Sequence, residues 1–162
     1  MPKLLLDFEV FGTAVPQGSM SNYGHGRVTH SKREKLMDWR GLIQRAVQAK
    51  APQFRQALVT APVAVRAIFY ATRPTSAPKK AIYKRTAPDL DKLQRALGDA
   101  LEGTVLQNDS CVVLWHAVKL YCDGAARLEV EIWELDAADV ETCTRAGAPS
   151  MALFDEPRAA SP

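Results

Sequence analysis

The chain has 162 residues, the usual size of one compact domain, and its 47% hydrophobic and 24% charged content is ordinary for a soluble protein. No apolar run approaches the roughly 18 residues of a membrane span, and the N-terminal residues lack the pattern of a secretion signal. The three cysteines show no Cys-x-x-Cys spacing, which argues against a disulfide framework or a zinc knuckle. We therefore expect a single cytoplasmic domain with reduced thiols.

The formal net charge of +3 conceals an uneven distribution along the chain. Residues 31–88 contain thirteen Lys or Arg and two acids, whereas residues 96–162 contain four basic and twelve acidic residues. A basic segment of this density is typical of a surface that meets a polyanion, because each Lys or Arg that contacts a phosphate releases condensed counterions. A solvated helix face and loop would give the same pattern, so charge alone leaves both interpretations open.

The first part of the chain predicts a strand, a loop and a helix. Residues 4–11 alternate between apolar and polar side chains, the period-two pattern of a half-buried strand. The Gly-rich segment 12–27 is too polar to pack as a regular element and predicts an exposed loop. A helix is predicted over 31–50, because Ser31 and Glu34 have the spacing of a capping box and Pro52 prevents further winding.

The middle of the chain repeats this order. Residues 63–70 alternate again and predict a second strand. Residues 73–85 carry five positive charges and two prolines and predict an exposed basic loop. A second helix is expected over 89–101, where Leu93, Leu97, Ala100 and Leu101 form one buried stripe and a glycine soon follows.

The last elements predicted are two strands, over 112–121 and 127–133. Asp123-Gly124 lies between them, and this dipeptide between alternating segments indicates a hairpin. Beyond these strands the chain loses all periodicity, so we expect residues 136–162 to form a poorly ordered tail. The fold class is therefore α+β, a small mixed sheet of about four strands with two main helices within residues 1–135.

Four aspartates directly follow the basic segment: Asp89, Asp91, Asp99 and Asp109. Asp91, Arg95 and Asp99 have i, i+4, i+8 spacing, which predicts one helix stripe opposite the leucines, and Asp109 lies in a turn before a strand. Hard divalent cations such as Mg²⁺ prefer carboxylate oxygens, and several such oxygens beside positive side chains are the usual arrangement for metal-assisted phosphodiester hydrolysis.

Each aspartate also has a structural interpretation, which the spacing leaves open. Asp89 can cap the second helix, and Asp91 suits the positive end of the helix dipole. Asp99 can simply pair with Arg95 one turn earlier, and Asn108-Asp109 can simply form a turn.

The order of the motifs adds a resemblance to these observations. The run Pro88-Asp-Leu-Asp-Lys-Leu-Gln-Arg-Ala96, then Asp99-Ala-Leu101, then Leu106 to Asp109 followed by Val112, resembles the RusA family of Holliday junction resolvases, with its D-x-D-N-L-x-K…D-A-L…D-D pattern. The segments Val15–Ser19 and Trp39-Arg40 also resemble phage members of the family. The resemblance covers about residues 4–135.

The resemblance implies site residues and a cofactor. Asp89, Asp91 and Asp109 become metal-binding catalytic acids supported by Asp99, with Mg²⁺ as the ion and Mn²⁺ as a substitute. The sequence departs from the pattern at three positions, because Lys92 replaces a common Asn, Arg95 replaces a catalytic Lys and Asn108 replaces the first acid of the final pair. Arginine does not readily give up a proton, so the catalytic role left for Arg95 is charge stabilisation.

The resemblance also implies a homodimer, and a C2 dimer suits a four-way junction, which is two-fold symmetric and is cut in two strands. Basic residues are expected to contact the DNA backbone, and two tyrosines in basic loops can stack on an unpaired base. These predicted DNA contacts are Arg27, Lys32, Arg33, Lys35, Arg73, Lys79, Lys80, Lys84, Arg85, Lys92, Tyr23 and Tyr83.

The sequence as a whole predicts a magnesium-dependent, structure-selective DNA endonuclease that resolves four-way junctions by paired symmetric nicks. Two alternatives stay open. A non-catalytic DNA-binding accessory protein would use the same basic surface, with its acids as caps and ion pairs. A nuclease for flaps or replication forks would use the same site on a differently shaped substrate.

Overall fold

The computed structural model describes residues 2–18 and 30–139. The main elements are β1 (Lys3–Phe11), α1 (His30–Lys50), β2 (Val63–Thr72), α2 (Leu90–Leu101), β3 (Val112–Cys122) and β4 (Arg127–Glu134), with two short 3-10 helices, η1 (Pro52–Arg55) and η2 (Asp109–Cys111). A four-stranded mixed sheet and two helices confirm the predicted α+β class. Of the predicted tail, residues 140–162 lie outside the described residues, as do residues 19–27 of the predicted Gly-rich loop.

The strand order in the sheet is β1-β4-β2-β3. Strand β4 runs antiparallel to β1 and β2, and β2 runs parallel to β3. The β2–β3 connection contains α2, as expected for parallel strands, which cannot be joined by a tight turn.

The predicted hairpin between the last two strands is wrong. Both strands form, but β2 lies between β3 and β4, so the two do not pair with each other. Residues 123–126 pass over the end of β2, where the Thr72 hydroxyl donates to the Gly124 carbonyl at 3.1 Å. Four residues suffice to span the roughly 10 Å between strands two positions apart, so the Asp-Gly turn signal marks a crossing over one strand here.

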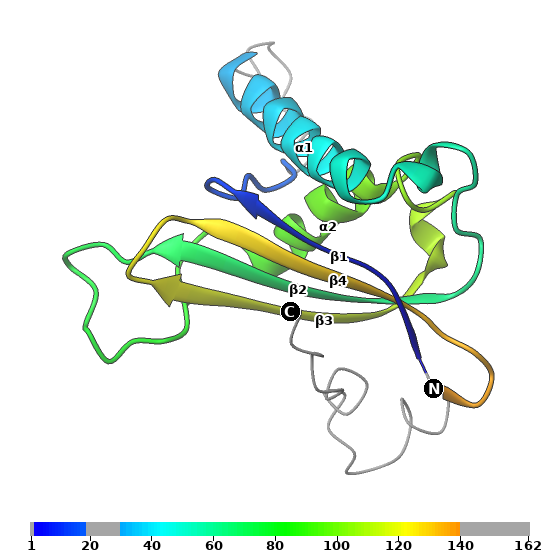
Figure 1. Cartoon of the computed structure of the whole chain (residues 1–162). Helices are drawn as coiled ribbons and strands as arrows, with labels where there is room; N and C mark the ends of the chain where they lie inside the picture. The colour runs from blue at the N-terminus through cyan, green and yellow to red at the C-terminus, as the bar shows by residue number, and fades with distance from the viewer. Residues whose placement is uncertain (1, 19–29, 140–162) are drawn as a thin grey trace, which may run out of the picture.

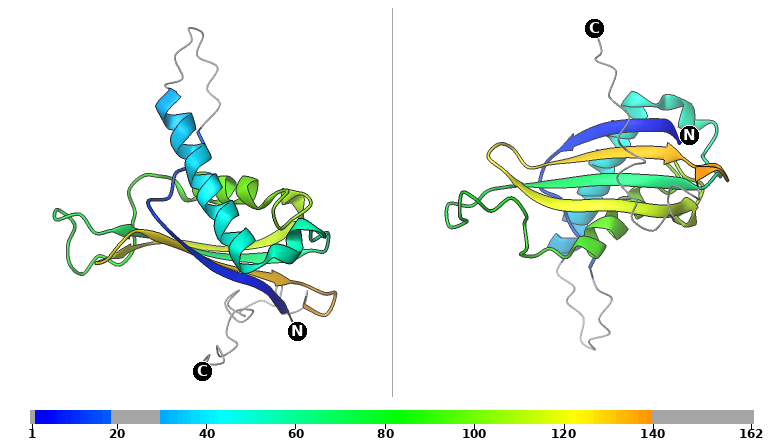
Figure 2. Two further views of the ribbon diagram at one scale, coloured as in Figure 1. Left: turned by 45° about the horizontal axis from the view of Figure 1, so that its top comes forward. Right: turned by 90° about the horizontal axis from the view of Figure 1, so that it is seen from below.

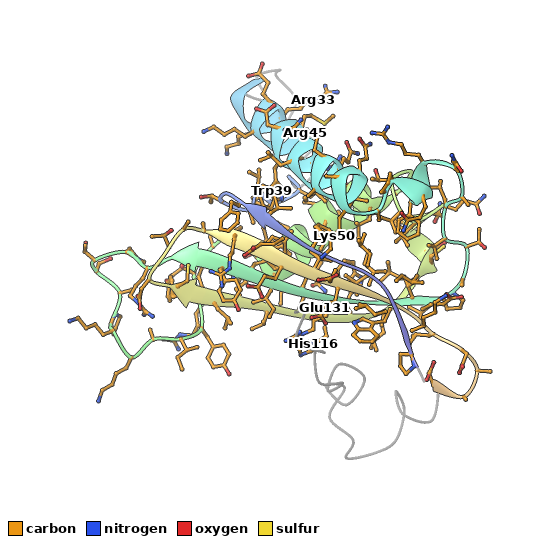
Figure 3. The ribbon with its side chains drawn as sticks, in the orientation of Figure 1. Arg33, Trp39, Arg45, Lys50, His116 and Glu131 are labelled. Carbon is orange, nitrogen blue, oxygen red and sulfur yellow. The ribbon has the colours of Figure 1, made fainter. Side chains whose placement is uncertain are left out.

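Both helices cover the same face of the sheet (Figures 1 and 2). The core lies between them and the alternate inward residues of β1, β2 and β4, where Phe8, Val65 and Ile132 are buried. Trp39 of α1 also lies in this layer (Figure 3), and Gly12, at φ +135°, turns the chain beneath its ring. A side chain at Gly12 would combine a strained backbone with a close contact to this ring.

The two helices follow the predicted pattern with one difference. The predicted stripe of α2, Leu93, Leu97, Ala100 and Leu101, is buried. Helix α1 begins at His30, so Ser31 lies inside the helix and is not the residue that precedes it. Helix boundaries are specified only to within one or two residues by local sequence. Within residues 2–18 and 30–139, no helix is both long enough and apolar enough to cross a bilayer.

Candidate active site

A cleft of about 300 Å³ opens beside α2. Its lining consists of Asp91, Gln94, Arg95 and Gly98 from α2, Asp109 from the start of η2, and Trp115 from β3. The structure therefore brings together three of the predicted catalytic residues, Asp91, Arg95 and Asp109, from two separate elements.

Buried neighbours fix the elements that border the cleft. The leucine stripe holds α2 against the core, which turns Asp91 and Arg95 outward one helical turn apart. Gly98 is buried, and a Cβ on it would lie 3.9 Å from Cζ2 of Trp115, so the helix backbone lies directly on the indole. Trp115 is thus the floor of the cleft.

Asn108 fixes the turn that presents Asp109. Its Oδ1 accepts from the backbone N–H of Ser110 at 2.9 Å, and its Nδ2 donates to Glu102 at 3.3 Å. The turn interpretation therefore holds for Asn108, whose side chain organises η2. Asp109 contributes no such bond and lines the cleft instead.

The carboxylates of the cleft have no partner among the residues that the structure describes. Within the described chain, no side-chain hydrogen bond or ion pair engages Asp91, Arg95 or Asp109. Two carboxylates and one guanidinium leave the cleft with a net negative charge, and like charges in one cleft repel each other. Binding of a cation between the carboxylates relieves this repulsion and is therefore favourable.

A second cavity, of about 260 Å³ over β1, β2 and β4, differs in this respect. Each charged side chain that lines it has an ion-pair partner: Lys50 pairs with Asp7 at 2.8 Å, Arg66 with Glu131 at 2.9 Å, and Arg127, which does not line the cavity, with both Glu9 and Glu129 at 3.0 Å. Glu131 and His116 lie on the sheet face opposite the helices (Figure 3). Each carboxylate of this cavity is therefore engaged by a cation of the protein, unlike Asp91 and Asp109 of the cleft.

Asp89 is placed beside the first turn of α2 but does not line the cleft. It precedes the helix at the N-cap position, yet its side chain makes no capping hydrogen bond, which contradicts the capping interpretation. Instead, Lys92 contacts its carboxylate at 2.8 Å. The hydrogen bond and the charge of Lys92 lower the pKa of Asp89, so this exposed carboxyl stays ionised.

Asp99 does not line the cleft, because its side chain pairs with a residue of α1. Arg40 forms an ion pair with it, and the same Nη2 donates to Gln17 Oε1 at 2.6 Å. The backbone N–H of Gln17 in turn donates to the Lys92 carbonyl at 3.0 Å. Asp99 therefore joins α2 to α1 and to the segment 12–18, and the alternative pairing with Arg95 does not form.

Helix geometry explains why Asp99 leaves the predicted stripe. Each residue of an α-helix advances about 100°, so two steps of four residues rotate a side chain by about 80° from the starting line. Asp91 and Arg95 stay close enough to share the cleft. Asp99 turns toward α1, where Arg40 meets it.

Lys119 of β3 is a site neighbour that the sequence analysis missed. Its ammonium donates to the carbonyls of Thr86 and Pro88, at 3.0 and 2.6 Å, just before Asp89. Burial, and secondarily the charge of Lys84, lower the pKa of Lys119. The signal was present in the sequence, because Lys119 falls on the same strand face as Trp115 and Ala117, where a half-buried strand rarely places a charge.

The predicted DNA-binding residues of the basic segment divide into two groups. The first is engaged within the protein: Arg73 donates to Asp123, Pro78 and Ala81 and lies over the Tyr121 ring, and Lys84 donates to Thr86. The second is exposed to solvent and comprises Lys79, Lys80, Tyr83 and Arg85. The segment extends beyond the end of β2 (Figure 1).

The remaining predicted DNA contacts lie on the helices or outside the described residues. Lys32, Arg33 and Lys35 are exposed near the start of α1, the end of that helix that projects from the sheet (Figures 1 and 3). Lys92 is half-buried and pairs with Asp89. Arg27 and Tyr23 lie outside the described residues.

An α+β domain with an unneutralised acidic cleft, an adjacent arginine and an exposed lysine-rich segment has the features of a nuclease for a polyanionic substrate. The family model for Endodeoxyribonuclease RusA matches residues 12–133, three quarters of the chain. The chain therefore belongs to the RusA endodeoxyribonuclease family. A comparison with curated proteins finds no match. Membership makes the chain an endonuclease, and it implies binding and cleavage of branched, junction DNA.

The cleft residues fit the divalent metal that this nuclease family generally uses. Among the described residues, no three or more His, Cys, Asp or Glu side chains gather closely enough to hold an ion by themselves. Mg²⁺ does not require such a cage, because it is commonly held by one or two carboxylates and keeps several waters and substrate phosphates as ligands. Asp91 and Asp109 supply two such carboxylates.

Proposed function

We propose that the chain resolves four-way DNA junctions by paired symmetric nicks, in a magnesium-dependent hydrolysis at the cleft of Asp91, Arg95 and Asp109. One observation carries the proposal: two carboxylates without partners among the described residues share an open cleft with an arginine, whereas each carboxylate of the second cavity is ion-paired.

Asp91 and Asp109 would hold the ion, and ionised Asp89 lies at the start of the same helix to contribute a further carboxylate. When bound, magnesium lowers the pKa of a coordinated water and polarises the phosphate. Arg95 donates hydrogen bonds to the phosphate oxygens and stabilises the charge that develops on them. Because a guanidinium keeps its proton, the proton for the leaving oxygen comes from solvent and not from Arg95.

The surrounding elements would hold the DNA. Lys79, Lys80 and Arg85 of the basic segment and the three cations at the start of α1 contact backbone phosphates, which positions the duplex arms without reading their sequence. Tyr83, which is 65% exposed, offers a ring on which an unpaired base can stack at the branch point. A homodimer would present two clefts to the two-fold symmetric junction. Asp99 serves this arrangement as a link between helices.

The test is cleavage of a branch-migratable four-way junction beside linear duplex and flap controls, with Mg²⁺ or EDTA. Wild type, Asp91→Asn and Asp109→Asn are compared with Asp7→Asn, a matched loss of one exposed carboxylate on β1. We expect paired nicks that require Mg²⁺, Asp91 and Asp109 but not Asp7. Tight junction binding by wild type without nicking in Mg²⁺ or Mn²⁺ would contradict the proposal and favour the accessory function. Faster cutting of the flap would favour a flap or fork nuclease.

A further inference from the structure

Two lysine side chains from different elements converge on the backbone that leads into the active site. Lys119 of β3 donates to the carbonyls of Thr86 and Pro88, at 3.0 and 2.6 Å. Lys84 donates to the Thr86 carbonyl at 3.1 Å, to its hydroxyl at 2.9 Å and to the Ala87 carbonyl. Three successive carbonyls directly before Asp89 therefore accept hydrogen bonds from ammonium groups.

Both lysines are fixed to the same strand. The backbone N–H of Lys84 donates to the Lys119 carbonyl at 3.0 Å, and the N–H of Tyr121 donates to the Ile82 carbonyl at 2.8 Å. Tyr83 and Leu120 form an antiparallel bridge, so residues 82–84 lie along the edge of β3. The same strand carries Trp115, the floor of the cleft. The lysines thus tie the residues before α2 to the strand that forms the floor.

The need to stabilise a surface loop does not explain why two lysines contact the same carbonyls. Two ammonium groups that share the Thr86 carbonyl repel each other, and the energy of that repulsion must be offset by the carbonyls and by the nearby Asp89. Ordinary turn residues would satisfy the same carbonyls with neutral donors or with water. The two charges lie at the one place where the chain enters the helix of the catalytic acids.

We propose that Lys119 and Lys84 are positioning residues that hold the backbone of residues 86–88 and so set Asp89 and the first turn of α2, with Asp91, against Trp115 and Asp109. The inference rests on the proposed metal-dependent function. It gives Lys84 a role inside the protein in place of the DNA contact that the sequence predicts. Outer groups that orient metal ligands typically account for about 10- to 100-fold in metal affinity.

The direction in which removal of a lysine changes metal affinity distinguishes a positioning role from a purely electrostatic one. A lysine that acts only as a nearby positive charge weakens cation binding, so its removal should tighten the binding of Mn²⁺. A lysine that positions the ligands strengthens cation binding, so its removal should weaken it. The two interpretations therefore predict opposite shifts.

The experiment measures Mn²⁺ affinity without DNA by electron paramagnetic resonance for wild type, Lys119→Met, Lys84→Met and Lys119→Arg. Lys3→Met is the matched control, because Lys3 is an exposed strand lysine on β1, away from the cleft. We expect about tenfold weaker Mn²⁺ binding for Lys119→Met, a smaller loss of the same sign for Lys84→Met, and recovery of part of the affinity in Lys119→Arg. Far-UV circular dichroism checks folding.

Each result bears on a different claim. Tighter or unchanged Mn²⁺ binding in Lys119→Met, relative to Lys3→Met, would overturn the positioning role and leave the proposed function intact. If Lys119→Met does not fold, unchanged or tighter binding in Lys84→Met would overturn it equally. A wild-type protein that binds no Mn²⁺ and cuts no junction would overturn the proposed function, and the positioning role with it.

Discussion

Replacement of Asp99 by Asn removes the negative charge that joins α2 to α1 but keeps an amide oxygen that can accept from Arg40. The Arg40 and Asp99 side chains are only 18% and 29% exposed, so water screens their ion pair less than it screens an exposed one. A hydrogen bond to a charged group contributes about 1.5–3 kcal/mol, and the amide retains part of it. We therefore expect Asp99→Asn to lower the free energy of unfolding by about 1–2 kcal/mol.

Thermal unfolding and a metal titration together check this value. For a domain of this size, a loss of 1–2 kcal/mol corresponds to a Tm decrease of about 2–8 °C. The Mg²⁺ concentration for half-maximal cleavage should stay within about twofold of wild type, because Asp99 does not line the cleft. Asp7→Asn is the control, since its pair with Lys50 is about half exposed and pairs of that kind contribute little.

A double-mutant cycle with Arg40→Met assigns the effect to the pair. The loss from Asp99→Asn should largely disappear when Arg40 is already absent, because no partner is left to lose. An unchanged Tm for Asp99→Asn, combined with a tenfold or larger increase in the Mg²⁺ requirement, would refute the reasoning and make Asp99 a metal ligand.

Four further predictions follow from the site. Asp91→Asn should lower the cleavage rate about a hundredfold or more, while junction binding in EDTA, measured by gel shift, stays equal or tightens because a negative charge facing phosphate is removed. Arg95→Lys should keep more activity in single-turnover cleavage than Arg95→Met, because the ammonium retains the positive charge; equal loss in both would show that a forked donor is needed. Lys92→Met should raise the pKa of Asp89 toward its ordinary 3.8 in an NMR titration. In wild type, the stabilisation from the Asp89–Lys92 pair is fully present above that pH, and it is lost as the pH falls through the lowered pKa. Light scattering after gel filtration should give twice the 17.8 kDa mass of one chain, and a mass of one chain at micromolar concentration would contradict the dimer.

Local periodicity in the sequence was sufficient to predict the four strands and the two α-helices. Alternation identified β1 and β2, and the leucine spacing identified α2 together with its buried stripe. The pairing of β3 and β4 was not predictable in the same way. An Asp-Gly turn indicates only that the chain reverses direction. Strand β2 lies between these two strands because it is apolar enough to be buried by neighbours on both sides.

The candidate site was predictable where one helix turn or one short motif carried it. Asp91 and Arg95 are one turn apart, and Asp109 follows from the motif before β3. Asp99 was assigned to the same stripe because an i+8 spacing looks aligned in the sequence although it has rotated by about 80°. The position of Lys119 on a half-buried strand face was visible in the sequence, but its partners are backbone carbonyls, and no sequence pattern reveals which carbonyls a distant lysine will meet.

The strand order has a consequence for how the chain acquires its structure during synthesis. Among the described residues, β1 pairs only with β4, so β1 cannot pair until β4 has been synthesised. Strand β2 likewise lacks one of its two neighbours until residue 134 has emerged from the ribosome. Contacts of such large sequence separation form late and together. The strands behind the cleft therefore gain their full support in one step near the end of the domain, and a nascent chain shorter than this carries the aspartates without the scaffold that aligns them.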